Sequence, residues 1–118
     1  MRKIIYLIIF LFPLSSFAKA CAGDGNVYDD LSCADRTLDS SKKELNAIYK
    51  KIYSFTQYKN ELEQSQKVWL DYREKQCNGY IAAEASQSQG VGAGSIVKDC
   101  LVEITRQRVD YLKTLLEK

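Results

Sequence analysis

The sequence predicts an all-α fold, a small antiparallel three-helix bundle stabilised by two disulfides. Three observations indicate this fold class. Apolar residues recur at helical spacing in three successive segments, no segment alternates like a β-strand, and four cysteines follow an export signal. Residues 21–118 are enough for one domain, whose modest core benefits from covalent crosslinks.

Residues 1–20 are expected to be a signal peptide. Arg2 and Lys3 form a basic start, residues 4–12 are all apolar, and the segment AKA at 18–20 fits a cleavage site before Cys21. The apolar run is shorter than the roughly 20 residues that a membrane-spanning helix needs. We therefore expect a periplasmic or secreted protein without a membrane span.

Cys21 at the start of the mature chain raises the alternative of a lipid anchor. A bacterial lipobox usually has Leu and then a small residue at the positions that Ala18 and Lys19 occupy here. The sequence thus favours the soluble exported form over a protein lipidated at Cys21.

Removing the signal peptide changes the net charge from +2 to −1. Of 17 basic and 15 acidic residues, the segment 1–20 holds three basic ones and no acid, which leaves 14 basic and 15 acidic. This balance argues against nucleic-acid binding.

The first helix is expected after an irregular lead-in at residues 21–30, which are rich in Gly, Asp and Asn. Asp29 or Asp30 can cap it, and a turn near residues 55–58 would end it. Its apolar face consists of Ala34, Leu38, Leu45, Ile48, Tyr49, Ile52 and Phe55.

The second helix is expected at residues 58–85, with a buried face of Leu62, Trp69, Tyr72, Gln76, Tyr80 and Ala83. Gln66, Trp69, Arg73 and Cys77 follow one another by three, four and four residues, so they share one side of the helix. We call these four residues the 66–77 stripe. Trp69 is expected to pack at the centre of the bundle, with the stem of Arg73 against its ring and an acid from another helix as partner. A role of Arg73 as an interface hot spot is the alternative.

Residues 86–95 (SQSQGVGAGS) predict a flexible loop before the third helix. Its residues are the candidate target-binding loop: Ser86, Gln87, Ser88, Gln89, Gly90, Gly92, Gly94 and Ser95. Ser95 can cap the third helix, whose buried face is expected at Val97, Leu101, Ile104, Tyr111, Leu112 and Leu115. The expected scaffold residues of the bundle are Leu45, Tyr49, Trp69, Arg73, Leu101 and Leu112.

The four cysteines predict two disulfides. Their gaps of 11, 43 and 22 residues, and the absence of histidine, do not fit the close pairs of a zinc site. The favoured pairing is Cys77–Cys100, at the base of the loop, with Cys21–Cys33. Cys33–Cys77 with Cys21–Cys100 remains open.

Catalysis is not expected, and no catalytic, metal-binding or cofactor-binding residue is predicted. The chain has no histidine, the most frequent general acid–base residue, and no G-x-S-x-G motif. The segment GVGAG at 90–94 lacks the preceding strand of a nucleotide-binding loop.

Several segments together resemble a known family. LNAIY at 45–49, QKVWLDYREKQC at 66–77, GS at 94–95 and CLVEITRQRVDYL at 100–112 occur in the order found in the N-terminal domain family of the lysozyme inhibitor LprI, a group of small secreted bacterial proteins. Cys21 and Cys33 match its amino-terminal cysteine pair. One departure is Glu74, where the family commonly has Asp after the arginine. The resemblance implies an LprI-like helical domain over residues 21–118.

The resemblance also implies a binding protein that blocks the cleft of a muramidase, a lysozyme-type glycoside hydrolase. Such enzymes use two carboxylates in an open cleft, and the polar loop at 86–95 is the segment expected to enter it. The alternative is an envelope interaction module, such as an immunity protein against a toxin delivered to the periplasm.

Overall fold

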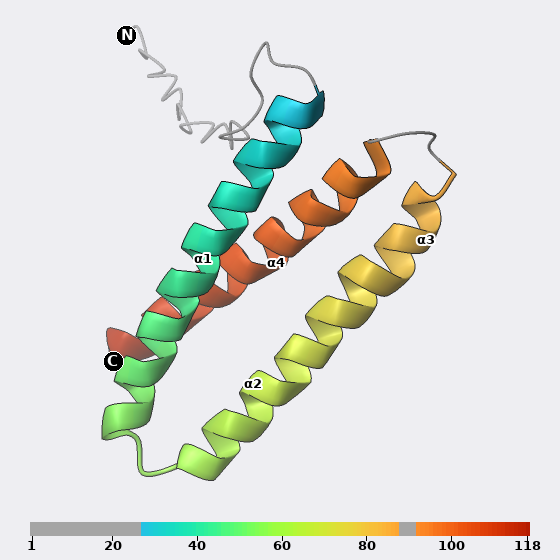
Figure 1. The fold of residues 1–118 in the computed structure, drawn as a ribbon. Coiled ribbons are helices and arrows are strands. Elements are labelled where there is room, and N and C mark those ends of the chain that lie inside the picture. The colour runs from blue at the N-terminus through green and yellow to red at the C-terminus, as the bar shows by residue number, and fades with distance from the viewer. Residues whose placement is uncertain (1–26, 88–91) are drawn as a thin grey trace, which may run out of the picture.

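The computed structural model describes residues 27–87 and 92–118, all of them helical apart from short turns (Figure 1). The elements are α1 (Val27–Phe55), α2 (Lys59–Glu74), the π-helix η1 (Lys75–Ile81), α3 (Ala82–Ala85) and α4 (Gly92–Leu116). Because α2, η1 and α3 follow one another without a break, they form one rod. The prediction of three helical segments is confirmed.

The rod runs opposite to α1 and α4, which run in the same direction (Figure 1). Two ion pairs show that α1 and α4 are parallel: Lys98 Nζ lies 2.6 Å from Asp35 Oδ1, and Lys113 Nζ lies 2.7 Å from Glu44 Oε1. Residue numbers thus rise together along both helices. Consecutive segments of the bundle are therefore antiparallel.

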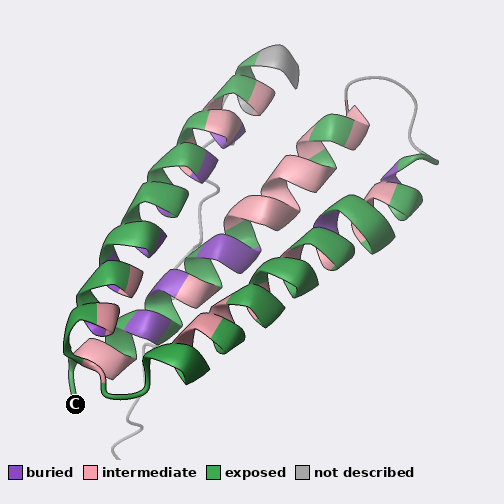
Figure 2. Ribbon diagram, turned by 60° about the horizontal axis from the view of Figure 1, so that its bottom comes forward, coloured by how far each residue is buried: buried purple, intermediate pink, exposed green. Residues whose placement is uncertain are grey.

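The hydrophobic core lies between α1 and α4. It consists of Leu45, Ile48 and Ile52 from α1, at steps of three and four residues, and Val109 and Leu112 from α4. Leu62, Trp69, Leu115 and Leu116 pack against it from outside. Figure 2 shows the buried residues on the sides of the two helices that face each other. Removal of these side chains from water is the main stabilising contribution.

The rod contacts the α1–α4 pair, but few residues of the rod become buried in this contact. No residue of α2 is buried, and the buried residues of η1 and α3 are only Cys77 and Ala85. Val68 and Tyr72 remain 70% and 53% exposed. The central segment is thus a peripheral helix held to a two-helix core.

The ends of the helices differ from the prediction in two places. Because α1 begins at Val27, Asp29 and Asp30 lie within its first turn and not at the position before it. Because α4 begins at Gly92, the predicted loop is shorter than 86–95, and Ser95 is helical instead of capping. Glycine costs about 1 kcal/mol in a helix relative to alanine, which is why the glycines of this segment favoured a loop in the prediction.

Three tyrosines predicted on buried faces are exposed: Tyr72, Tyr80 and Tyr111, by 53%, 58% and 55%. For Tyr80 the reason is η1, whose wider π-helical turns break the 3.6-residue period on which the prediction rested. For Tyr111 the reason is that the buried face of α4 passes through Ile104, Thr105, Val109 and Leu112.

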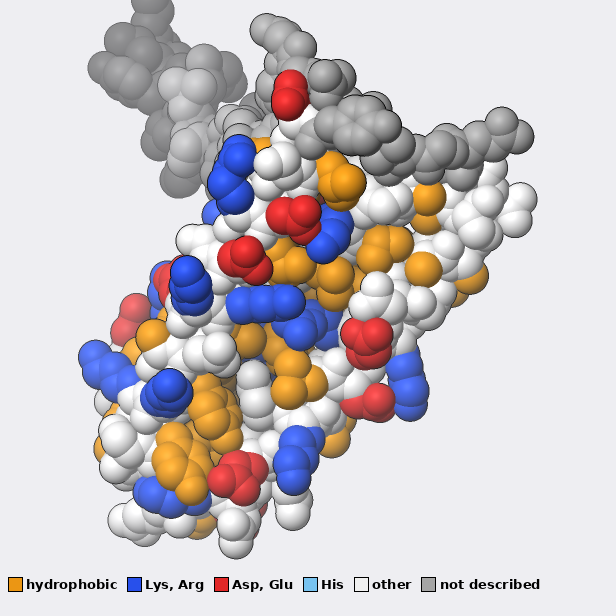
Figure 3. Space-filling view, in the orientation of Figure 1, with side chains coloured by type: hydrophobic (Ala, Val, Ile, Leu, Met, Phe, Trp, Pro, Cys, Tyr) orange, Lys and Arg blue, Asp and Glu red, His pale blue; other side chains and the backbone are white. Residues whose placement is uncertain are grey.

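The predicted signal peptide and Cys21 lie outside the described residues. Among residues 27–87 and 92–118, no helix is long and apolar enough to cross a membrane, and no cluster of His, Cys, Asp and Glu could hold a metal ion. Acidic and basic side chains are mixed on the face shown in Figure 3.

Candidate functional site

The 66–77 stripe faces α4 along its whole length. Gln66 Oε1 accepts a hydrogen bond of 3.1 Å from Arg108 Nε, and Arg73 Nη1 donates one of 3.1 Å to Thr105 Oγ1. The Trp69 ring lies 5.7 Å from the Arg108 guanidinium, and Cys77 is bonded to Cys100. The stripe is therefore the contact surface of the rod with α4.

Arg73 contacts the Trp69 ring, as predicted, with its guanidinium carbon 5.0 Å from the ring centre. The predicted acidic partner is wrong, because the hydroxyl of Thr105, which is fully buried, takes that place. Burial lowers the pKa of Arg73, and the nearby Glu74 carboxylate opposes this shift. The buried Nε atom has no hydrogen-bond partner within the described part of the chain.

Arg108 approaches the same tryptophan from α4 and extends the cluster outwards. Its guanidinium carbon lies 5.8 Å from the Tyr111 ring, and Nη2 donates to Ser65 Oγ at 3.4 Å. Burial lowers its pKa, against an opposing effect of Tyr111. No role was predicted for Arg108 from the sequence. Its helical spacing could have indicated one, because it lies three residues after Thr105 and four before Leu112, on the same side of α4.

Trp69 is not at the centre of the bundle, in contrast to the prediction. It is half-buried and packs against the edge of the core. Two guanidiniums make cation–π contacts with the Trp69 ring in addition to these apolar neighbours. The Trp69–Arg73–Arg108 cluster is therefore a polar joint between α2 and α4.

Of the other expected scaffold residues, Leu45 and Leu112 are buried, with 3% and 0% exposed. Tyr49 and Leu101 are half-buried. The Tyr49 ring stacks on Tyr53, with centroids 6.1 Å apart.

The disulfide Cys77–Cys100 is present, with 5.5 Å between the Cα atoms. It confirms that pairing and excludes the alternative Cys33–Cys77 with Cys21–Cys100. None of the described cysteines is free. Pairing of Cys33 with Cys21 stays a prediction, because Cys21 lies outside the described residues.

The predicted loop residues fall into three groups. Ser86 and Gln87 are exposed in a turn after α3, where Ser86 Oγ donates to Ala83 O at 2.6 Å. Ser88, Gln89 and Gly90 lie outside the described residues. Gly92, Gly94 and Ser95 belong to the first turns of α4.

The fold and its polar joint define a small, disulfide-crosslinked helical scaffold. A family model described as "Lysozyme inhibitor LprI" matches residues 18–112, and the chain belongs to this family of lysozyme inhibitors. The family is described as one of inhibitors and not of enzymes. Together with the disulfide, it indicates a protein located outside the cytoplasm.

A curated relative is an uncharacterized protein of Rhizobium meliloti (strain 1021). It is 28% identical, over 72% of this chain and 70% of the relative. No solved structure matches this chain.

Proposed function

We propose that this protein inhibits a lysozyme-type muramidase in the periplasm or outside the cell, by occupying its cleft with the segment 86–95. The observation that carries the proposal is the family match over residues 18–112. The enzyme's two catalytic carboxylates need hydrogen-bond donors from a blocking segment. Serine hydroxyls, glutamine amides and backbone N–H groups of this segment can supply them.

The position of the segment supports this mechanism. Its described parts, the turn after α3 and the first turn of α4, lie at the end of the molecule opposite the turn between α1 and α2 (Figure 1). Cys77–Cys100 joins the helices that lead into and out of it, which limits how far they can separate. An anchored segment loses less conformational entropy on binding than a free one.

The test is inhibition of cell-wall lysis by a chicken-type lysozyme, with the double variant Ser86→Ala, Gln87→Ala. We expect the inhibition constant to rise about tenfold or more, since each lost hydrogen bond costs about 1 kcal/mol and more when a charge accepts it. Unchanged lysis with micromolar wild-type protein would exclude inhibition of that lysozyme class.

Ser54→Ala, Gln57→Ala is the matched control at the other end of the molecule. Ser54 Oγ donates to Lys51 O at 2.6 Å, as Ser86 Oγ does to Ala83 O, and all four residues are exposed. This control should inhibit like the wild type. Equal inhibition by both double variants would rule out the 86–95 mechanism while leaving the inhibitor function intact.

A second candidate function is a general envelope interaction module, such as an immunity protein. The exposed apolar side chains of Val68 and Tyr72, four residues apart on one face of α2, support it because contiguous exposed apolar groups are typical of protein interfaces. Tyr72→Asp distinguishes the two functions. Full lysozyme inhibition by this variant leaves α2 free for another partner, whereas lost inhibition identifies α2 as the lysozyme contact.

A further inference from the structure

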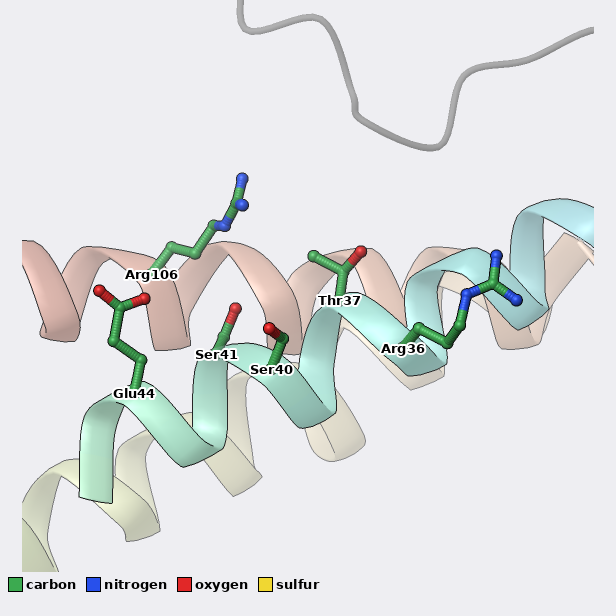
Figure 4. Close-up of a pocket in the computed structure, with 6 residues that line it drawn as sticks. All are labelled: Arg36, Thr37, Ser40, Ser41, Glu44 and Arg106. Atoms are coloured by element: carbon green, nitrogen blue, oxygen red, sulfur yellow. The ribbon is translucent and has the colours of Figure 1, made fainter. Parts of the chain in front are cut away.

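A shallow groove follows the contact between α1 and α4, apart from the polar joint and from the segment 86–95. Its lining residues are Arg36, Thr37, Ser40, Ser41 and Glu44 of α1 and Arg106 of α4. Figure 4 shows the Ser41 hydroxyl and the Arg106 guanidinium on the same side of the helix pair. The groove has a volume of about 240 Å³, below the roughly 300–1,000 Å³ of sites for drug-sized ligands. It therefore suits a small ligand or a single functional group.

The groove presents unused hydrogen-bond donors. Ser41 is only 5% exposed, yet neither its hydroxyl nor that of Ser40 is bonded to any other residue that the structure describes. The Arg106 guanidinium likewise has no hydrogen bond or ion pair within residues 27–87 and 92–118. The Ser41 hydroxyl is not among the fully buried polar atoms of residues 27–87 and 92–118, so it still faces solvent and a ligand in the groove can reach it.

The charges around these donors favour an anion. Arg36 and Arg106 carry two positive charges, and Arg36 Nη1 uses one donor on Ser32 Oγ at 3.1 Å. The one carboxylate of the lining, Glu44, is held by Lys113 at 2.7 Å. The neighbouring Asp35 is likewise held by Lys98 at 2.6 Å. The lysines thus largely neutralise the charges of both acids, whereas no carboxylate within the described residues forms an ion pair with Arg36 or Arg106.

We infer that this groove binds a small oxyanion, a carboxylate or phosphate group. Arg106 supplies charge-assisted hydrogen bonds from its planar fork, and Ser40 and Ser41 supply hydroxyl donors. The Arg36 guanidinium is directed toward Ser32, away from Arg106, so it adds positive charge only at longer range (Figure 4). The inference is independent of lysozyme inhibition, because no residue of the groove belongs to the proposed blocking segment.

The competing explanation is that Arg106 serves only to balance the charge of Glu44. The two explanations differ for Glu44→Gln. In an oxyanion site this substitution removes repulsion and frees Lys113, so anion affinity should rise about threefold. If Arg106 only balances Glu44, the same substitution leaves anion affinity unchanged.

The test is an NMR titration of isotope-labelled protein recovered from the periplasm. Acetate, inorganic phosphate and chloride are added separately at constant ionic strength. We expect saturable shifts of the backbone amides of residues 36–44 and 104–108 with acetate or phosphate. Shifts with acetate alone would identify a carboxylate site, and shifts with phosphate alone a phosphate site. Equal shifts with chloride, or shifts that never saturate, would overturn the inference.

Variants then assign the site. Arg106→Gln should weaken binding about tenfold, and Ser41→Ala should weaken it severalfold, because each removes a donor to the charged ligand. Lys67→Gln, an equal charge change on exposed α2, should leave affinity unchanged. Arg106 is also exposed, so its variant should remain folded. Equal weakening by Arg106→Gln and Lys67→Gln would mean that only net charge attracts the anion, against the inference.

Discussion

Arg73 lies with its guanidinium carbon 5.0 Å from the centre of the Trp69 ring and donates a hydrogen bond to Thr105 on the neighbouring helix. Arg108 approaches the same ring from that helix at 5.7 Å. The only tryptophan of the chain thus connects two cations across the contact of α2 with α4. This joint supplies attraction where α2 contributes no buried residue.

The planar guanidinium of Arg73 should matter more than its charge. Arg73→Lys keeps the charge and the stem but loses stacking on Trp69 and the geometry of the bond to Thr105. We expect the free energy of unfolding to fall by about 1–2 kcal/mol. Urea denaturation monitored by tryptophan fluorescence measures it. Arg106→Lys, an exposed site on α4, is the control and should change stability by less than about 0.5 kcal/mol.

The disulfide should stabilise the rod more than the α1–α4 pair. We expect the double variant Cys77→Ala, Cys100→Ala to lower the free energy of unfolding by about 2–4 kcal/mol, as is typical of a disulfide. The bond joins residues 23 positions apart in the sequence. Because α2 buries no residue, hydrogen exchange should accelerate mainly in residues 59–85. Equal acceleration in the α1 and α4 amides would show instead that the three helices unfold as one unit.

Leu112 should be the costliest leucine to truncate on α4. Its side chain is fully buried among Leu45, Ile48, Ile52 and Val109. Leu112→Ala should lower the free energy of unfolding by about 2–5 kcal/mol, because it leaves a cavity in the core. Leu70→Ala, at a position 42% exposed, is the matched control and should cost far less in the same thermal or urea melts.

The hydrogen bond of Tyr80 should make part of the stability sensitive to alkaline pH. Tyr80 donates to Glu84 Oε1 at 2.5 Å, and this bond raises the pKa of Tyr80 above its usual 10.0. A raised pKa in the folded state gives stability that is complete below the unfolded pKa and is lost as pH rises through the folded pKa. Wild type should therefore be more stable than Tyr80→Phe at neutral pH, and the difference should disappear above the raised pKa. A difference that is constant with pH would contradict this assignment.

Several features could be predicted because they depend on local order along the chain. Helical spacing located the three segments, and the turn after Phe55 lies where it was expected. The spacing of Gln66, Trp69, Arg73 and Cys77 predicted that they share one side, and all four contact α4. The reversal between Cys77 and Cys100 predicted their bond. The candidate loop was predicted less well, since Gly92, Gly94 and Ser95 belong to α4.

By itself, then, the sequence determined a helical chain, the segments of its helices, and the side of the rod that meets α4. Only the tertiary structure decided that α1 and α4 enclose the core and leave α2 outside it. It also decided that Trp69 lies between two arginines, and that unpartnered donors meet in a groove with Arg106. The physical reason is that helical periodicity shows which residues share a face, whereas burial depends on how closely a second helix approaches that face.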